Sequence, residues 1–178
     1  MSENYWKDAY KDKWDEASKR EIRVKKDLEK HTGKKCIKSG LGAGSSEYIS
    51  GNAASNGHQK GDADFWIQGT NIYVEVTGPL KDTVSSEAPL WFRPDKVENA
   101  IKNRDHDVFL VHHCLSADLW RVIHVDTEFK WRYRNNEFKV VEPIIRGRKE
   151  RYVEVNVNDR CIKYWDYLLN YIKEYKEI

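Results

Sequence analysis

The chain has 178 residues, enough to bury a substantial hydrophobic core, and we predict a single domain over residues 1–178. Charged residues make up 34% of the sequence, yet the net charge is only +2, which excludes both a wholly basic and a wholly acidic nucleic-acid or protein-binding tail. Any surface for a charged partner must therefore be a local patch.

The cysteine pattern and the apolar segments indicate where the protein works. Three widely spaced cysteines form no CxxC pair, which argues against a disulfide framework and a zinc ribbon and favours a reducing setting. We expect a cytoplasmic protein, in the host cell if the protein is viral. The chain does not open on the apolar run of a signal peptide, and no window approaches the roughly 18 apolar residues of a membrane span, so we expect no membrane partner.

The first predicted element is a long helix over residues 4–32, ended by Gly33. Glu21 fills a gap in its apolar stripe, which consists of Tyr10, Trp14, Ala17, Val24 and Leu28. A carboxylate at a buried position is costly unless it is paired or bound to a metal. The sequence leaves open whether Glu21 meets a partner lysine, lies on the rim of the helix or belongs to a functional site.

A short strand over residues 35–38 and a loop over residues 39–61 follow. Loops of this length in compact domains are usually functional or disordered. Its glycines do not complete GxGxxG, and GxxxxGK[ST] is absent, so neither a dinucleotide nor a nucleoside triphosphate is favoured. Glu47 is a spare candidate ligand or a solvated loop charge.

The next two predicted strands, 62–67 and 72–77, each have one apolar face and one face with carboxylates. Asp62 and Asp64 share a face of the first strand, and Glu75 and Thr77 share a face of the second. Pairing as a hairpin would bring Asp64 and Glu75 to the same side, with opposed Cβ atoms roughly 4.5 to 5.5 Å apart. Two such carboxylates repel unless a cation lies between them, and hard oxygen ligands suit Mg²⁺ or Mn²⁺. The pattern predicts a divalent metal site.

Asp64, ten intervening residues and then Glu75-Val76-Thr77, on a hairpin with an apolar reverse face, resemble the motif of the PD-(D/E)XK nuclease superfamily, also called restriction-endonuclease-like. The resemblance covers roughly the first two thirds of the chain in the order of elements and is specific only across the hairpin. It implies an α/β fold with a mixed central sheet flanked by helices (an αβββαβ core), here with an added C-terminal hairpin and helix. It also implies Mg²⁺ or Mn²⁺ bound by Asp64, Glu75 and the backbone carbonyl of Val76. The motif lysine is replaced by Thr77, which can hold a water but carries no charge.

The same resemblance implies two further roles. Many of these nucleases carry an acidic residue on the first helix that reaches the metal, and Glu21 is the matching position. In some members the lysine lies on a neighbouring element, which makes Lys60, Lys81 and Lys96 the candidates here. We favour Lys96, in the first turn of a helix predicted from Pro94 to about Arg104; an ordinary surface lysine is the alternative for each.

The rest of the chain is predicted to complete the sheet. Residues 107–115 read as a buried central or parallel strand on which His112 and His113 point to opposite faces, and they form no zinc spacing with His124 or Cys114. Residues 120–125 and 152–157 read as strands, residues 130–141 as an edge hairpin, and residues 161–177 as a closing helix with Ile162, Trp165, Leu169 and Ile172 inward. In the hairpin Lys130, Arg132 and Arg134 alternate with aromatics, a pattern that fits either tracking of a phosphate backbone or protection of a sheet edge.

Together these features predict a metal-dependent endonuclease that hydrolyses phosphodiester bonds in DNA, or in RNA, with a catalytic group of Glu21, Asp64, Glu75, Thr77 and Lys96. The predicted nucleic-acid contacts are Lys60, Lys81, Arg93, Lys130, Arg132 and Arg134. An inactive module of the same fold that binds nucleic acid or a partner protein is the alternative, favoured by Thr77. A metal-independent small-molecule enzyme that uses the histidines is a third interpretation, and a homodimer stays open.

Overall fold

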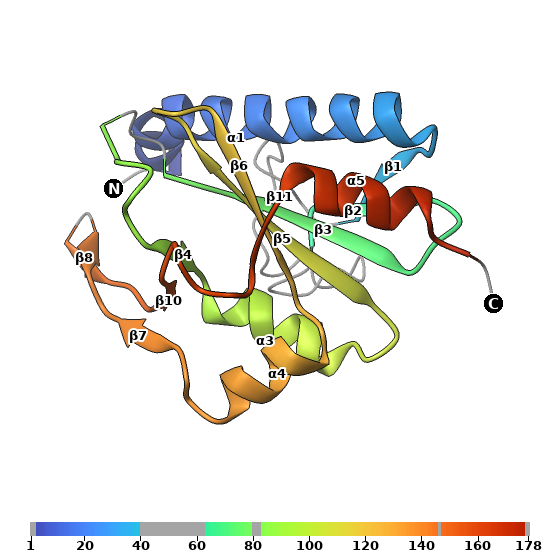
Figure 1. Cartoon of the computed structure of the whole chain (residues 1–178). Helices are drawn as coiled ribbons and strands as arrows, with labels where there is room; N and C mark the ends of the chain where they lie inside the picture. The colour runs from blue at the N-terminus through green and yellow to red at the C-terminus, as the bar shows by residue number, and fades with distance from the viewer. Residues whose placement is uncertain (1–2, 40–62, 80–82, 146, 177–178) are drawn as a thin grey trace.

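The computed structural model describes residues 3–39, 63–79, 83–145 and 147–176, with side chains from residue 17 onward (Figure 1). The first half of the chain contains α1 (Glu3–Thr32), β1 (Cys36–Lys38), β2 (Phe65–Ile67), β3 (Ile72–Thr77), β4 (Leu90–Phe92) and α3 (Pro94–Lys102). The second half contains β5 (Asp107–Cys114), β6 (Leu119–His124), α4 (Thr127–Arg134), β7 (Lys139–Val141), β8 (Ile144–Ile145), β9 (Arg148–Lys149), β10 (Tyr152–Val155), β11 (Ile162–Tyr164) and α5 (Trp165–Lys173).

A mixed six-stranded sheet in the order β1-β2-β3-β5-β6-β11 forms the centre of the molecule. β3 and β5 run parallel, with Ile72 opposite Asp107 at one end and Thr77 opposite His112 at the other. The remaining neighbours are antiparallel. A parallel pair needs a crossover connection, which β4 and α3 supply. β5 is buried over nearly its whole length, which confirms the predicted central strand.

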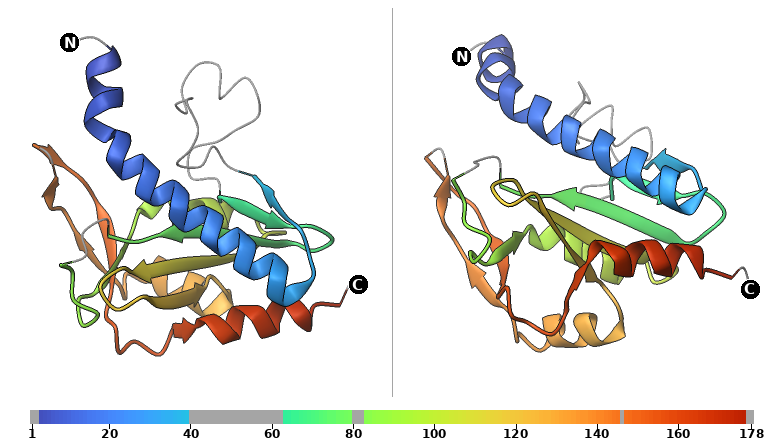
Figure 2. Two further views of the ribbon diagram at one scale, coloured as in Figure 1. Left: turned by 90° about the horizontal axis from the view of Figure 1, so that it is seen from above. Right: turned by 45° about the horizontal axis from the view of Figure 1, so that its top comes forward.

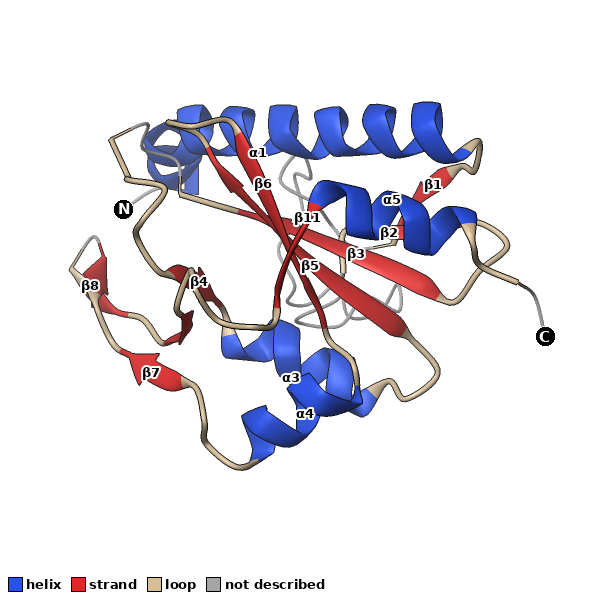
Figure 3. Cartoon of the chain, viewed as in Figure 1, coloured by secondary structure: helices blue, strands red, loops and turns tan. Residues whose placement is uncertain are grey.

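Helices cover both faces of this sheet (Figures 2 and 3). α1 and α5 pack against one face through Val24, Leu28, Leu168, Leu169 and Ile172. α3 and α4 pack against the other face through Val97, Ala100 and Phe129. Each fully buried Val, Leu, Ile or Phe side chain among these stabilises the fold by about 1.5 to 3 kcal/mol. The predicted mixed sheet flanked by helices is therefore confirmed.

The long first helix ends where the sequence predicts. Gly33 has φ +70°, and its backbone N–H donates to the carbonyl of Glu29 at 3.0 Å, an arrangement that glycine adopts without strain at a helix end. None of the described helices, the long α1 included, is of a length and apolarity that would cross a membrane.

The predicted hairpin over residues 130–141 is wrong in its first arm, which is helix α4. Asp126 caps this helix, because its side chain accepts a hydrogen bond from the backbone N–H of Phe129 at 2.9 Å. Phe129 and Arg132 are buried at a spacing of three residues, which is helical. Alternation of cationic and aromatic side chains therefore indicated a strand where the cap and the burial produce a helix.

The predicted closing helix begins later than residue 161, at Trp165, and the residues before it form β11 at the edge of the main sheet. Ile162 packs with the core beneath α3 and α4, whereas Leu169 and Ile172 pack with the core beneath α1. One helix face cannot serve both sides of a sheet, so the chain changes structure between them. A smaller sheet, β4-β10-β7, flanks the main one.

Candidate active site

Two carboxylates meet where β2 and β3 separate. The register pairs Phe65 with Val74, so Asp64, one residue before β2, lies opposite Glu75 of β3. Both residues are only 7% exposed. The hairpin thus brings together the two acidic residues on which the predicted metal site depends.

The two carboxylates differ in their hydrogen bonds. The backbone N–H of Val76 donates to Oδ2 of Asp64 at 2.8 Å. In contrast, Oε2 of Glu75 is buried and has no hydrogen-bond partner within the described part of the chain. Because ionised carboxylates only accept hydrogen bonds, Asp64 and Glu75 cannot satisfy each other unless one of them is protonated.

Burial changes the acidity of both groups. Burial raises the pKa of Asp64 above its ordinary value. Burial, followed by the negative charge of Asp64, raises the pKa of Glu75 well above its ordinary value. The pair therefore favours a proton or a cation between its oxygens.

Lys96 supplies one positive charge to the pair. Its Nζ lies 3.2 Å from Oε1 of Glu75. α3 presents Lys96 from its first turn, while Val97 and Ala100 hold the helix against the sheet. Burial disfavours the charged ammonium, but the charges of Glu75 and Asp64 more than offset this effect, so the pKa of Lys96 is raised. Lys96 is therefore charged at neutral pH and balances one of the two carboxylates.

Glu21 of α1 reaches the same place from the other side. Burial is the main influence on the pKa of both Asp64 and Glu75, but a hydrogen-bonding contact with Glu21 lowers the pKa of Asp64. The negative charge of Glu21 also raises the pKa of Glu75. Glu21 itself is half-buried. Three carboxyl groups and one ammonium thus converge from α1, the β2–β3 hairpin and α3.

The donor atoms at this site suit a hard cation. In the ranges that the structure describes, no group of three or more His, Cys, Asp or Glu side chains is already arranged to hold a metal ion. Lys96 instead contacts one oxygen of Glu75. The carboxylate oxygens of Asp64 and Glu75 are nevertheless the ligand type that Mg²⁺ and Mn²⁺ prefer. The buried Oε2 of Glu75 is the atom that a cation would satisfy.

Arg20 adjoins this group, and the sequence interpretation did not single it out. It is 7% exposed and donates from its two terminal nitrogens to the carbonyls of Gly78 at 3.1 Å and Pro79 at 2.9 Å. One signal pointed to it: Arg20 precedes Val24 by four residues and Leu28 by eight, so it lies on the buried stripe of α1.

The other predicted site residues are dispersed or lie outside the described residues. Thr77 is half-buried at the end of β3, beside His112 in the sheet register. Arg93 is exposed just before α3 and pairs with Asp95 at 2.9 Å. The positions outside the described residues are Glu47, Lys60, Asp62 and Lys81.

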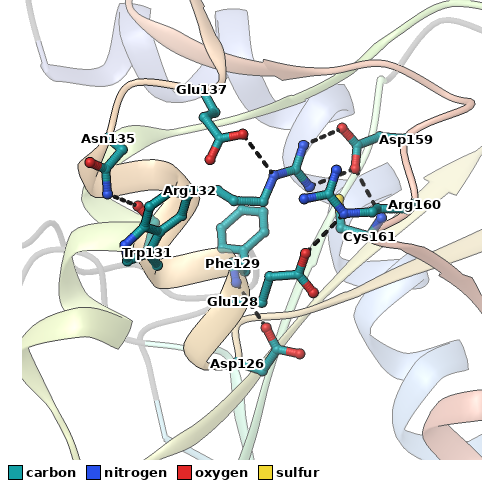
Figure 4. A network of polar contacts seen from close by, with 10 residues as sticks. All are labelled: Asp126, Glu128, Phe129, Trp131, Arg132, Asn135, Glu137, Asp159, Arg160 and Cys161. Carbon is teal, nitrogen blue, oxygen red and sulfur yellow. Dashed lines mark hydrogen bonds and ion pairs between the residues drawn. The ribbon is translucent and has the colours of Figure 1, made fainter.

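The three cations predicted to follow one strand lie instead on helix α4, where Lys130 and Arg134, four residues apart, share a face and Arg132 is buried. Arg132 is 5% exposed and donates to both carboxylate oxygens of Asp159 at 2.8 Å (Figure 4). Its guanidinium also lies over the ring of Phe138. Arg132 is thus engaged inside the protein, which removes the basis for grouping it with Lys130 and Arg134 as phosphate contacts.

The paired histidines of β5 point to opposite faces, as predicted. His112 meets the edge of Phe92, and burial followed by the charge of Arg121 lowers its pKa to about 3. His113 stacks on Trp120 and makes a 2.8 Å contact from Nε2 to Asp118. The two imidazoles therefore belong to different environments.

Comparisons with known proteins add little to this geometry. No protein-family model matches the chain, and no curated protein matches it significantly. Among solved structures, a nuclease from a fusselovirus is similar over 71% of this chain and 72% of that chain, with a TM-score of 0.41 and 16% sequence identity. A likeness this distant supports no argument about fold or activity, so the function has to be inferred from the site itself.

Proposed function

We propose that the chain is a restriction-endonuclease-like, divalent-metal-dependent nuclease. The observation that carries the proposal is the buried Asp64–Glu75 pair, in which one oxygen of Glu75 has no hydrogen-bond donor among the described residues. A fold without a use for this pair would gain stability by replacing it, because buried charges that are only partly compensated are unfavourable. Functional sites are where proteins retain such arrangements.

Asp64 and Glu75 would hold Mg²⁺ or Mn²⁺ through their carboxylates. The N–H of Val76 faces Asp64. In a strand, the N–H and C=O of one residue point to the same side, so the carbonyl of Val76 is available to the same ion. Glu21 would complete the ligands from α1. When bound, the ion would lower the pKa of a coordinated water and neutralise charge that develops on the phosphodiester.

Lys96 would replace the charge that is absent at Thr77. Its ammonium already lies beside Glu75, and no rearrangement of the backbone is needed to bring it to the site. From there it can donate a hydrogen bond to the attacking water or to a phosphate oxygen. Thr77 would contribute at most a hydrogen bond to a water.

The proposed substrate is nucleic acid, with DNA as the first to test. The exposed Arg93 lies three residues before Lys96, where it can contact a phosphate that flanks the cleaved bond. Arg93 and Lys96 are each paired with a carboxylate, Asp95 and Glu75, so a phosphate bound at the N-terminal end of α3 would share these cations with the protein's own acidic groups.

Calorimetric titration with Mn²⁺ and cleavage of plasmid and oligonucleotide DNA and RNA test the proposal. The wild type should bind Mn²⁺ and cut with Mg²⁺ or Mn²⁺, whereas Asp64→Asn and Glu75→Gln should lose both properties. Asp166→Asn, an exposed carboxylate in the first turn of α5, is the matched control and should retain both. A wild type that binds no Mn²⁺ and cuts nothing would refute the nuclease proposal.

A second candidate is a module of the same fold that binds nucleic acid or a protein without cleaving. Two observations favour it: Thr77 in place of the motif lysine, and the contact of Lys96 with an oxygen that a metal would use. In this case Lys96 is the permanent counter-charge of Glu75. Binding of DNA or RNA that is independent of Mn²⁺, together with absence of cleavage, would support the module over the enzyme.

A further inference from the structure

We propose that Arg20 is the positioning residue that holds Glu21 against the Asp64–Glu75 pair; this inference rests on the proposed function. Arg20 and Glu21 are neighbours on α1 and point to different partners. Arg20 donates hydrogen bonds to the carbonyls of Gly78 and Pro79, just after β3. Glu21 contacts Asp64 of the hairpin. One residue of the helix is thus anchored while the next is directed at the site.

The anchor fits its surroundings closely. A Cβ atom added at Gly78 would lie 2.3 Å from the carbonyl oxygen of His113 and 3.1 Å from Cζ of Arg20. Gly78 also has φ +155°, a conformation that favours glycine. The guanidinium therefore packs directly on backbone, where it has little room to move.

Arg23 provides a second anchor on the same turn of α1. It makes a two-pronged contact with Asp118 at 2.7 and 2.9 Å and lies over the ring of Trp120. Asp118 belongs to the β5–β6 turn and has φ +46°. Because this pair is largely exposed, water weakens it, and we assign the larger share of the anchoring to the buried Arg20.

Anchoring is needed because Glu21 approaches groups of its own charge. In the absence of a metal ion, Lys96 balances only one carboxylate, so the remaining negative charge disfavours Glu21 beside Glu75, and a movement of α1 that carried Glu21 away would relieve this repulsion. The two hydrogen bonds from the rigid guanidinium fork resist this movement. Residues that orient metal ligands in this way typically contribute 10 to 100-fold to metal affinity.

The proposal is tested by a double-mutant cycle in which Mn²⁺ affinity is measured by calorimetry on Arg20→Met, Glu21→Gln and the double variant. If Arg20 acts through Glu21, Arg20→Met weakens binding by about 10 to 100-fold, and the double variant binds no more weakly than Glu21→Gln alone. Arg132→Met is the matched control, because it also removes a buried arginine with two hydrogen bonds, and it should leave the affinity unchanged. Measurements are made where circular dichroism shows every variant to be folded.

Hydrogen exchange of the metal-free protein provides a second readout. Amides around residues 20–24 of α1 should exchange faster in Arg20→Met and at the wild-type rate in Glu21→Gln. If Arg20→Met does not fold, Arg20→Lys replaces it; lysine keeps the charge but lacks the fork, so the same losses are expected to a smaller extent.

The outcomes separate the two proposals. A wild type that binds no Mn²⁺ overturns the proposed function and this inference with it. If the wild type binds Mn²⁺, three results would overturn the positioning role alone. These are an Arg20 variant with the wild-type affinity, fully additive losses of affinity in the double variant, or unchanged hydrogen exchange in α1.

Discussion

Two buried clusters of charged side chains in this protein differ in how their carboxylates are satisfied, although each holds one buried polar atom without a hydrogen-bond partner among the described residues, Nε of Arg132 and Oε2 of Glu75. Around Arg132, both oxygens of Asp159 accept from the guanidinium, and this contact lowers the pKa of Asp159 (Figure 4). Around Glu75, one oxygen lacks a donor among the described residues, and burial raises the pKa of the carboxyl group. The first cluster stabilises the fold, whereas the second is held in place by the fold at a cost in stability. We therefore assign structure to the first cluster and function to the second.

After the losses expected of the metal-ligand variants, the largest effect is on catalysis and comes from Lys96→Met. Removing the ammonium from Glu75 should lower the cleavage rate by about 10² to 10⁴, because a group that orients or activates the water is lost. Mn²⁺ affinity should stay equal or rise, since the metal no longer competes with the ammonium for Oε1 of Glu75. Single-turnover cleavage and calorimetry measure the two effects separately.

Lys102→Met, at the exposed end of the same helix, is the control for Lys96→Met and should change neither quantity. Undiminished cleavage by Lys96→Met would remove Lys96 from the mechanism. A fall in Mn²⁺ affinity would show that the ammonium supports the metal site and does not compete with the ion.

The pH dependence of stability should have opposite signs in the two clusters. An unfolded Glu has a pKa of about 4.3. Because the pKa of Glu75 is raised in the folded state, its contribution is fully present below about pH 4 and is lost as the pH rises through the folded pKa. The pKa of Asp159 is lowered, so its contribution is present above about pH 4 and is lost as the pH falls.

Urea unfolding of the metal-free protein at pH 7 and pH 4 checks this difference. At pH 7, Asp159→Asn should lose about 3 kcal/mol, since it leaves the buried Arg132 without its counter-charge. At the same pH, Glu75→Gln should gain about 1 kcal/mol, as substitutions that relieve a functional site often do. The gain from Glu75→Gln should shrink at pH 4, whereas the loss from Asp159→Asn should stay nearly as large at pH 4 and shrink only as the pH falls further, through the lowered pKa of Asp159. Destabilisation by Glu75→Gln at pH 7 would contradict the contrast between the clusters.

A residue could be assigned to the candidate site from the sequence when its partner is also a side chain in a regular pattern. Asp64 and Glu75 are separated only by a hairpin, so alternation alone predicts that they meet. Arg20 escaped notice because it bonds to backbone carbonyls 58 and 59 residues away, and carbonyls have no signature in a sequence.

The fold was predictable for the same reason, and the prediction failed where two periodicities compete. The first helix, the hairpin, α3 and the central strand follow simple apolar spacing. In α4, alternation of cations and aromatics resembles a strand, and the cap at Asp126 decides for helix. At Ile162, helical spacing continues, but the side chain packs on the opposite face of the sheet from Leu169. Such tertiary preferences are not visible in local spacing.

The smallest expected effect concerns Arg93, which distinguishes substrate binding from chemistry at the functional cluster. Arg93 is exposed, and its ion pair with Asp95 is weak in water, so its guanidinium is available to a phosphate. Arg93→Gln should leave Mn²⁺ affinity and protein stability unchanged. It should reduce the slope of the logarithm of the DNA-binding constant against the logarithm of the salt concentration by about one, the value for one phosphate contact. Arg134→Gln is the comparison, because Arg134 is also exposed but lies on α4, whereas Arg93 directly precedes the helix that carries Lys96. Fluorescence anisotropy over a range of salt concentrations measures both slopes. An equal reduction in the two variants would mean that DNA contacts α4 as well as α3, and that the surface serving the functional cluster extends towards the structural one.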